Sequence, residues 1–362
     1  MTAPSVQTGV NQSKFQTPPT IWSAAFSFGD RWGISCYNAR VESFLEVFIT
    51  ELSISTLLSN LTGLFLLIGA GFLAVRAGWL PKAATEPLTA LLFKITLPAT
   101  AFYSMLRPFT ASFLRDALII MGIDVAAHLI YTALSLVLVR LFRVPAGRRG
   151  MWCTCCAFCN NGFMGFPVAY ALFGEEGLAL AVMLGLAYNL LFYSVGAKLI
   201  TLDRNTGDGQ IQMPWRKIWF SPVNLAMVGG LVFFCGQLSL PVAIATPIQH
   251  LSNVTTPLSM FVIGMNLSES RMVDVIRDRD VLSACVVRLL LFPLLAWAAL
   301  AFLPIADSLI FGVFLIIMAM PSPAASVVLG EQYDGCVELG ARTVFLSSLL
   351  CILTIPLIAL LL

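Results

Sequence analysis

Long apolar runs alternate with short polar segments from residue 52 to the last residue, 362. A helix that crosses a bilayer needs about 20 mostly apolar residues, so the pattern predicts ten membrane spans. The first five expected spans cover residues 52–75, 88–106, 117–139, 150–173 and 177–197. The second five cover residues 222–240, 242–267, 281–303, 308–330 and 343–362. The predicted fold class is therefore all-α, a polytopic membrane protein.

The polar segments predict how the chain is divided. Residues 1–50 lack a basic stretch followed by an apolar one, so we interpret them as a disordered or atypical N-terminal tail and not as a signal peptide. Residues 51–200 are expected to form a first five-helix repeat and residues 221–362 a second. Residues 201–220 would join the two as a cytoplasmic linker.

The composition agrees with a membrane protein. Hydrophobic residues make up 58% of the chain and charged residues 11%, against about 25% charged residues in a typical soluble domain. A soluble protein of this size cannot bury that much apolar surface in one core. The net charge of +2 gives no indication of nucleic-acid binding. The expected location is the plasma (inner) membrane.

Four cysteines are clustered in the fourth span: Cys153, Cys155, Cys156 and Cys159. They supply enough sulfur for a tetrahedral zinc site, but no histidine is close to them in sequence. We interpret them as small apolar residues that pack between helices, with lipidation or a redox role as the alternative. No metal and no cofactor are expected.

Lysine and arginine are concentrated in the odd-numbered connections between spans. The third connection alone carries Arg140, Arg143, Arg148 and Arg149. Cytoplasmic connections are rich in these residues, so the odd connections are expected in the cytoplasm. An even number of spans then places both termini outside.

Prolines recur at a nearly constant distance along the chain. The pairs, separated by 159, 160 and 156 residues, are Pro98 with Pro257, Pro81 with Pro241, and Pro167 with Pro323. This regularity indicates an internal duplication. Because each half has an odd number of spans, the second half would enter the membrane upside down, and inverted repeats are typical of secondary transporters.

Spans four and nine carry Gly, Pro and polar residues at mid-membrane, in segments 159–167 and 318–326. Proline removes a main-chain donor and clashes with the preceding turn, so both helices are expected to break. Unwound main chain is tolerated at this depth where it lines a wet cavity, and half-helix N-termini there favour an anion. The segments predict a crossover site for an anion; kinked but continuous packing helices are the alternative.

The segment Asn160-Asn161-Gly162-Phe163-Met164-Gly165-Phe166-Pro167 resembles the fourth-span motif of the auxin efflux carrier family. That family includes plant PIN-type carriers and bacterial dicarboxylate permeases. Residues 256–267 resemble its seventh span and residues 319–333 its ninth. The resemblance, which covers residues 52–362, implies two inverted five-helix repeats with broken helices 4 and 9. It also implies an elevator-like motion against a scaffold of spans 1, 2, 6 and 7.

The same resemblance implies roles for single residues. Asn160 corresponds to the substrate-contacting asparagine at the crossover, and Tyr188 to a site tyrosine in the fifth span. Ser326 stands where the plant carriers have a second proline. The short linker resembles the bacterial members, whose substrates are small carboxylates. The full set of expected substrate-binding residues lies in spans two, four, five and nine: Lys94, Asn160, Asn161, Pro167, Tyr188, Asn189, Pro321, Pro323 and Ser326.

Four ionisable residues inside the expected spans suggest further chemistry, because charge at such depth is costly. Lys94 either attracts a substrate carboxylate or has a structural partner. Asp124 and His128, four residues apart on one helical face, could relay a proton or hydrogen-bond across helices. For Arg288, near a cytoplasmic end, a snorkelling residue or a structural ion pair is favoured over a functional role.

Together these features predict a secondary transporter for small organic anions, either dicarboxylates or auxin-like indole acids. A sodium- or proton-coupled symporter or antiporter of a related fold is the alternative. An enzyme is not expected, because neither His128 nor His250 has a partner for nucleophilic catalysis nearby in sequence. The expected partners are a small carboxylate, membrane lipid and a second copy of the chain in a homodimer.

Overall fold

The computed structural model describes residues 54–203, 220–269, 275–301 and 308–362. All of them belong to one compact unit, Val47–Leu362. The predictions made for the N-terminal tail, residues 1–50, and for most of the linker 201–220 fall outside the described residues.

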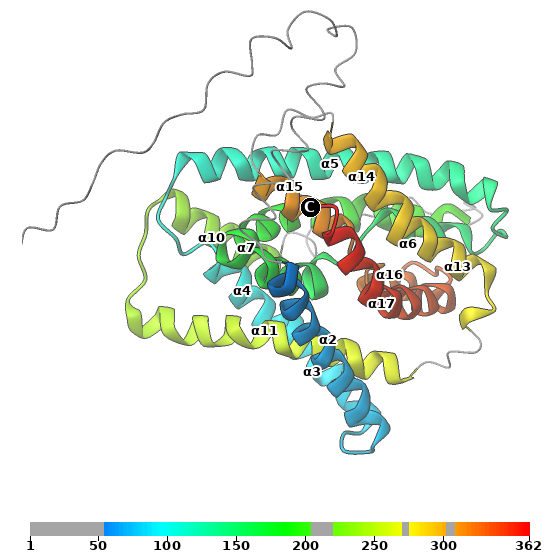
Figure 1. The fold of residues 1–362 in the computed structure, drawn as a ribbon, viewed down its shortest axis with the longest axis horizontal. Helices are drawn as coiled ribbons and strands as arrows, with labels where there is room; N and C mark the ends of the chain where they lie inside the picture. Colours follow the sequence, from blue (N-terminus) through cyan, green and yellow to red (C-terminus); the bar gives the residue numbers. More distant parts are fainter. Residues whose placement is uncertain (1–53, 204–219, 270–274, 302–307) are drawn as a thin grey trace, which may run out of the picture. The chain divides into compact units, whose positions relative to one another are not determined.

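The first half of the described chain is a succession of helices joined by short turns (Figure 1). The longer ones are α2 (Ile54–Arg76), α3 (Thr85–Leu91), α4 (Leu97–Tyr103), α5 (Ala111–Leu141), α6 (Arg149–Ala157) and α7 (Phe166–Leu191). Short helical pieces are η1 (Lys82–Ala84), η2 (Leu92–Thr96), η3 (Asn161–Gly165), η4 (Phe192–Gly196), α8 (Ala197–Ile200) and η5 (Thr201–Asp203).

The second half is built in the same way. Its helices are α10 (Pro222–Cys235), α11 (Val242–Glu269), α13 (Arg279–Val286), η6 (Val287–Leu291), α14 (Phe292–Ala301), α15 (Ser308–Met318), α16 (Ala325–Gln332) and α17 (Val337–Ala359). The described residues contain no strand, so the all-α prediction is confirmed.

Several described helices have the length and composition of membrane spans. Four stretches are long and apolar enough to cross a bilayer: Ala111–Leu141, Arg149–Asp203, Arg279–Leu300 and Val337–Ala359. The second of these turns at Gly174, where a φ of 65° and a ψ of −154° interrupt α7. Glycine adopts this backbone conformation without steric cost. Shorter apolar helices are Leu61–Arg76, Pro222–Cys235 and Leu309–Met318. The arrangement of ten spans in two inverted repeats stays a prediction.

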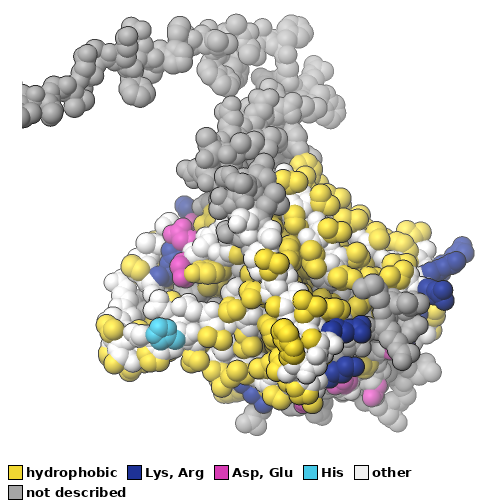
Figure 2. Space-filling view, turned by 60° about the horizontal axis from the view of Figure 1, so that its bottom comes forward, with side chains coloured by type: hydrophobic (Ala, Val, Ile, Leu, Met, Phe, Trp, Pro, Cys, Tyr) yellow, Lys and Arg dark blue, Asp and Glu magenta, His cyan; other side chains and the backbone are white. Residues whose placement is uncertain are grey.

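Side-chain exposure also fits a lipid environment. Large apolar side chains lie on the surface of several helices, for example Leu118, Ile130 and Val137 on α5, which are 58%, 56% and 61% exposed. Figure 2 shows hydrophobic side chains spread across much of one face of the molecule. Continuous exposed apolar surface is costly in water and is expected where lipid covers a protein.

The helices pack in two groups. In the first group, α11 packs against α2 and α4, and α10 packs against α4. In the second group, α5 packs against α6 and α7, α15 against α7 and α14, and α17 against α6, α13 and α16. Contacts between the groups are fewer and involve mainly α7, η3 and α17. Each group contains helices from both halves of the sequence.

A close crossing of α2 and α11 joins the first group (Figure 1). A Cβ atom added to Gly71 would lie 2.0 Å from the carbonyl oxygen of Phe261. One added to Gly264 would lie 1.9 Å from the carbonyl oxygen of Ile68. Only glycine permits this approach of the two main chains, as at other membrane helix interfaces that rely on small residues.

Candidate functional site

The first helix interruption follows α6. The helix ends at Ala157, Phe158 is extended with φ −111° and ψ 155°, and π-helical η3 begins at Asn161. The local sequence Asn160-Asn161-Gly162 favours this end, because Asn and Gly are poor helix formers. Proline is tolerated in the first turn of a helix, and Pro167 lies there in α7. The break therefore lies seven to nine residues before Pro167, and not at the proline as the sequence suggested.

The second interruption lies between α15 and α16. Helix α15 ends at Met318 and α16 begins at Ala325. The intervening segment holds Pro321 and Pro323. Proline cannot donate to the preceding turn, and it pushes the residue before it out of the helical region. Here the prolines do cause the break that the sequence predicted.

The two interrupted segments, residues 158–160 and 319–324, contact each other directly, and we call the place where they meet the crossover. The main-chain N–H of Asn160 donates to the carbonyl oxygen of Pro321 at 2.8 Å. The Ser322 hydroxyl donates to the carbonyl oxygen of Cys155 at 2.8 Å. The Ser322 N–H in turn donates to the Ser347 hydroxyl of α17 at 3.1 Å. Main-chain groups that the breaks leave unpaired thus find partners across the crossover, as buried polar groups must.

Arg288 of η6 completes this crossover. Its side chain is fully buried, and its guanidinium donates only to main-chain carbonyl oxygens in the described part of the chain. Nε bonds the oxygen of Met320 at 3.0 Å, Nη1 that of Cys156 at 3.2 Å, and Nη2 that of Met318. The interpretation as a snorkelling residue or an ion pair is therefore wrong. A snorkelling arginine would reach water, whereas Arg288 holds the ends of α6 and α15.

A cavity of about 710 Å³ opens at the crossover, between the two helix groups. The first group contributes residues of α3, η2, α4, α10 and α11, and the second contributes residues of η3, α7, η4, α16 and α17. Residues from the expected site that line it are Lys94, Asn160, Asn161, Tyr188, Asn189 and Pro323. Aromatic rings that line it are Phe93, Phe163, Phe166, Phe192, Tyr193 and Phe345.

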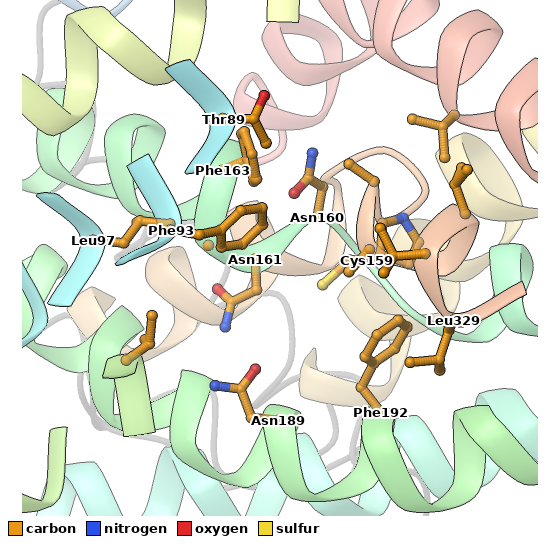
Figure 3. Close-up of a pocket in the computed structure, with 18 of the residues that line it drawn as sticks. Thr89, Phe93, Leu97, Cys159, Asn160, Asn161, Phe163, Asn189, Phe192 and Leu329 are labelled. Atoms are coloured by element: carbon orange, nitrogen blue, oxygen red, sulfur yellow. The ribbon is translucent and has the colours of Figure 1, made fainter. Parts of the chain in front are cut away.

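Adjacent asparagines point in different directions within this cavity. Figure 3 shows the Asn160 amide directed away from the Asn161 amide, which points toward Asn189. The Asn160 amide makes no side-chain hydrogen bond to another described residue, although only 5% of the residue is exposed. Asn161 Oδ1 is buried and also has no hydrogen-bond partner among the described residues. The Asn189 amide donates to Asn224 Oδ1 at 2.7 Å. The cavity therefore offers the Asn160 amide to a ligand, whereas Asn161 Oδ1 is too buried to reach one.

Tyr188 supports the interrupted segment from α7. Its hydroxyl donates to the carbonyl oxygen of Cys159 at 2.6 Å, and its ring stacks on Phe192 with centroids 5.6 Å apart. Tyr188 thus presents its ring to the cavity while its hydroxyl fixes the residue that precedes Asn160.

Lys94 lies on π-helical η2 and is exposed where it lines the cavity. Among the described residues it has no carboxylate within ion-pair distance. π-Helical turns within longer helices occur frequently at functional sites. The role of Lys94, attraction of a substrate carboxylate or a structural contact, stays a prediction.

Three expected site residues lie elsewhere. Pro167 lines a second cavity of about 350 Å³. Pro321 and Ser326 do not line the first cavity; Pro321 accepts the hydrogen bond from Asn160, and the Ser326 hydroxyl donates to the Pro323 carbonyl at 2.7 Å. Phe166 lines both cavities.

Asp124 and His128 form a buried pair on α5. His128 Nδ1 lies 3.0 Å from Asp124 Oδ1 and 2.9 Å from the Asp124 carbonyl oxygen. The imidazole stacks on Phe158, with ring centroids 5.3 Å apart, and meets the edge of Tyr188 at 5.4 Å. The pair therefore lies directly behind the interrupted segment, next to the cavity wall.

Three of the clustered cysteines, Cys153, Cys155 and Cys156, are buried in α6, and the fourth, Cys159, lines the cavity. Cys155 Sγ lies 3.7 Å from the Ser326 hydroxyl. Within the described ranges no group of three His, Cys, Asp or Glu residues could hold a metal ion.

Comparison with known proteins identifies the family of this chain. The sequence model of the family described as "Membrane transport protein" matches residues 56–359. The chain belongs to this family. It is the family that the fourth-, seventh- and ninth-span motifs resemble, so that prediction is confirmed.

Two archaeal relatives are similar over most of the chain. An uncharacterized transporter of Methanothermobacter thermautotrophicus is 27% identical over 292 residues, which cover 80% of this chain and 93% of the relative. An uncharacterized transporter of Methanocaldococcus jannaschii is 25% identical over 295 residues, covering 81% and 94%. This membrane transport protein therefore spans nearly the full length of these relatives.

Proposed function

We propose that this membrane transport protein carries small organic anions, most simply carboxylates, and binds them at the crossover of its two interrupted helices. The observation that carries the proposal is the cavity of about 710 Å³ at the crossover, which exposes the Asn160 amide and the Lys94 ammonium group. Amide N–H groups and an ammonium group both donate to a carboxylate. Since the other described residues of the lining are uncharged, the anion would be held weakly enough to leave.

The packing of the helices supports an elevator-type motion. The group formed by α2, α4, α10 and α11 corresponds to spans 1, 2, 6 and 7, the expected scaffold. The other group carries both interruptions. The cavity lies where the two groups meet, so sliding the second group along the first would carry the site across the membrane. Equivalent helices of both halves in each group also support the inverted repeat.

The two cavities support alternating access. The larger cavity reaches helix ends next to the odd-numbered connections, at Tyr193, Ser221, Leu267 and Gln332. The smaller one reaches Glu175, in an even-numbered connection. If the odd connections are cytoplasmic, as their arginines indicate, this conformation is open to the cytoplasm. The Phe166 side chain would then separate the two sides.

Proton coupling is the second candidate, because of one observation. The buried pair Asp124–His128 packs behind the crossover, against Phe158 and Tyr188. A histidine at this position could take up or release a proton as the substrate arrives. A sodium-coupled carrier would instead need a cage of oxygen ligands, and the lining of the larger cavity holds no carboxylate in the described part of the chain.

A thermal-shift screen on the purified protein tests the proposal. Monocarboxylates, dicarboxylates and indole acids would be compared with their amides. A ligand at 100 times its Kd stabilises a protein by about 2.7 kcal/mol, so a bound carboxylate raises Tm. Uptake of that carboxylate into proteoliposomes should then be lost in Asn160→Ala. A protein stabilised only by uncharged compounds would contradict anion transport.

A further inference from the structure

Arg288 is a buried cation that lines neither the larger nor the smaller cavity. It is fully buried and has no carboxylate within ion-pair distance in the described ranges. A buried charge without an ionic partner is costly. Such a cost is retained only where the charge contributes to structure or function.

The crossover itself is electrically balanced without Arg288. Each helix end carries about half an elementary charge, positive at the N-terminus and negative at the C-terminus. The C-terminal ends of α6 and α15 meet the N-terminal ends of η3 and α16 at the interruptions. The two positive and two negative ends cancel. An anion would therefore gain little from the helix ends alone.

The contacts of Arg288 break this balance. Its guanidinium binds the carbonyl oxygens of Cys156, Met318 and Met320, which belong to the negative ends of the half-helices or directly follow them. The positive ends are left unopposed on the cavity side. Met320 adjoins Pro321, whose carbonyl oxygen accepts the Asn160 N–H. The Arg288 charge is thus linked to the Asn160 main chain through the Met320–Pro321 segment.

We propose that Arg288 is a positioning residue that makes the crossover select anions over uncharged ligands, through its charge and without contact. This inference rests on the proposed function. Asp124 lies close enough to interact with the Arg288 charge, and His128 adjoins Asp124. With the protonation of that pair unchanged, removing Arg288 lowers the charge behind the crossover by one unit.

The test compares carboxylates with their neutral amides on detergent-purified protein. The probe pairs are indole-3-acetate with indole-3-acetamide, and succinate with succinamide, with Kd measured for each. We expect Arg288→Gln to lower the preference for carboxylate over amide by tenfold or more. Arg288→Lys keeps the charge and should keep the preference, even if the fold is less stable.

Ser322→Ala is the matched control, because it removes a neutral hydrogen bond to Cys155 at the same crossover. It should change carboxylate and amide binding equally. An unchanged preference in Arg288→Gln would overturn the inference and leave the proposed function standing. If Arg288→Gln does not fold, loss of the preference in folded Arg288→Lys would overturn it. Wild-type protein that binds no carboxylate, or prefers the amides, would overturn the proposed function and this inference with it.

Discussion

The main-chain N–H of Asn160 donates a hydrogen bond to the carbonyl oxygen of Pro321 across 161 residues of sequence, at 2.8 Å. This bond joins the interruption after α6 to the interruption after α15. It also fixes the backbone of Asn160, so the side-chain amide faces the cavity without a partner among the described residues. The geometry of the candidate site therefore depends on both halves of the chain.

The first prediction concerns the Asn160 amide. Asn160→Ala should raise the Kd for the best-bound carboxylate by about tenfold or more, because a hydrogen bond to a charged group contributes about 1.5–3 kcal/mol. The main-chain bond to Pro321 is kept in this variant. Calorimetry on the purified protein would measure the change. Asn253→Ala is the matched control, since Asn253 lines only the smaller cavity. Equal Kd values for both variants and wild type would move the site away from the crossover.

A second prediction concerns Lys94. At about 4 Å in water-like surroundings two opposite charges attract by about 1 kcal/mol, and Lys94 is exposed in the cavity. Lys94→Gln should therefore weaken carboxylate binding by about fivefold, while Lys94→Arg retains most of it. Binding isotherms of the two variants decide the matter. If both variants bind like wild type, Lys94 has no part in recognition.

The third prediction concerns an ion-pair network beside α6, α13 and α17. Arg148 binds Asp278 at 2.5 Å and also Asp280, and Arg342 binds Asp278 at 3.4 Å. Burial alone would raise the pKa of the Asp278 carboxyl. The hydrogen bond and charge of Arg148, with the N–H groups of Asp280 and Val281, outweigh it and lower the pKa.

A lowered pKa gives stability that is present above the unfolded value, about 3.9, and is lost as the pH falls through the folded value. Arg148→Ala should lower Tm by about 2–4 °C at pH 7, and the difference from wild type should shrink below about pH 4. Melting curves in detergent across this range test it. Arg140→Ala, exposed at the end of α5, is the control and should melt like wild type. A constant difference at all pH values would exclude the carboxylates as the cause.

A fourth prediction concerns the α2–α11 crossing. Gly71→Ala should destabilise the protein by about 1–3 kcal/mol, as overpacking does, because its Cβ would lie 2.0 Å from the Phe261 carbonyl oxygen. Gly63→Ala, on the same helix, would meet no atom within 4 Å. It should be neutral or slightly stabilising, since Ala favours helix over Gly. Size-exclusion profiles after heating would compare the two, and equal profiles would contradict the tight crossing.

The fifth prediction concerns orientation. In a variant that lacks Cys36, the exposed Cys235 and the partly exposed Cys336, Arg143→Cys should be shielded from an impermeant thiol reagent in intact cells. Permeabilised cells should show labelling. Labelling in intact cells would reverse the orientation, and with it the side to which the larger cavity opens.

The sequence predicted the helices and both interruptions because these depend on local residues. Apolar length defines the spans, and poor helix formers at Asn160, Asn161 and Gly162 mark one break. Pro321 and Pro323 mark the other. Pro167 does not mark the break, because proline in a first helical turn costs nothing. Most of the residues expected at the site, including Asn160, Tyr188 and Lys94, do line the larger cavity.

Arg288 could not be placed from the sequence. Its partners are main-chain carbonyl oxygens, 30 to 132 residues away along the chain. No side-chain pattern encodes main-chain partners. The only available signal was an arginine inside an apolar span with no acidic residue one helical turn away. Helix ends in the membrane core need donors or cations, and this requirement could have pointed to it.

The mixed composition of the two helix groups has a consequence for synthesis of the protein. Helix α2 needs α11 to cover Gly71, and α6 needs Arg288 of η6 to satisfy the carbonyl oxygen of Cys156. When the ribosome has completed only the first half, neither group has all its members. The early helices must therefore remain in the bilayer with part of their packing surface uncovered until the later helices have been inserted.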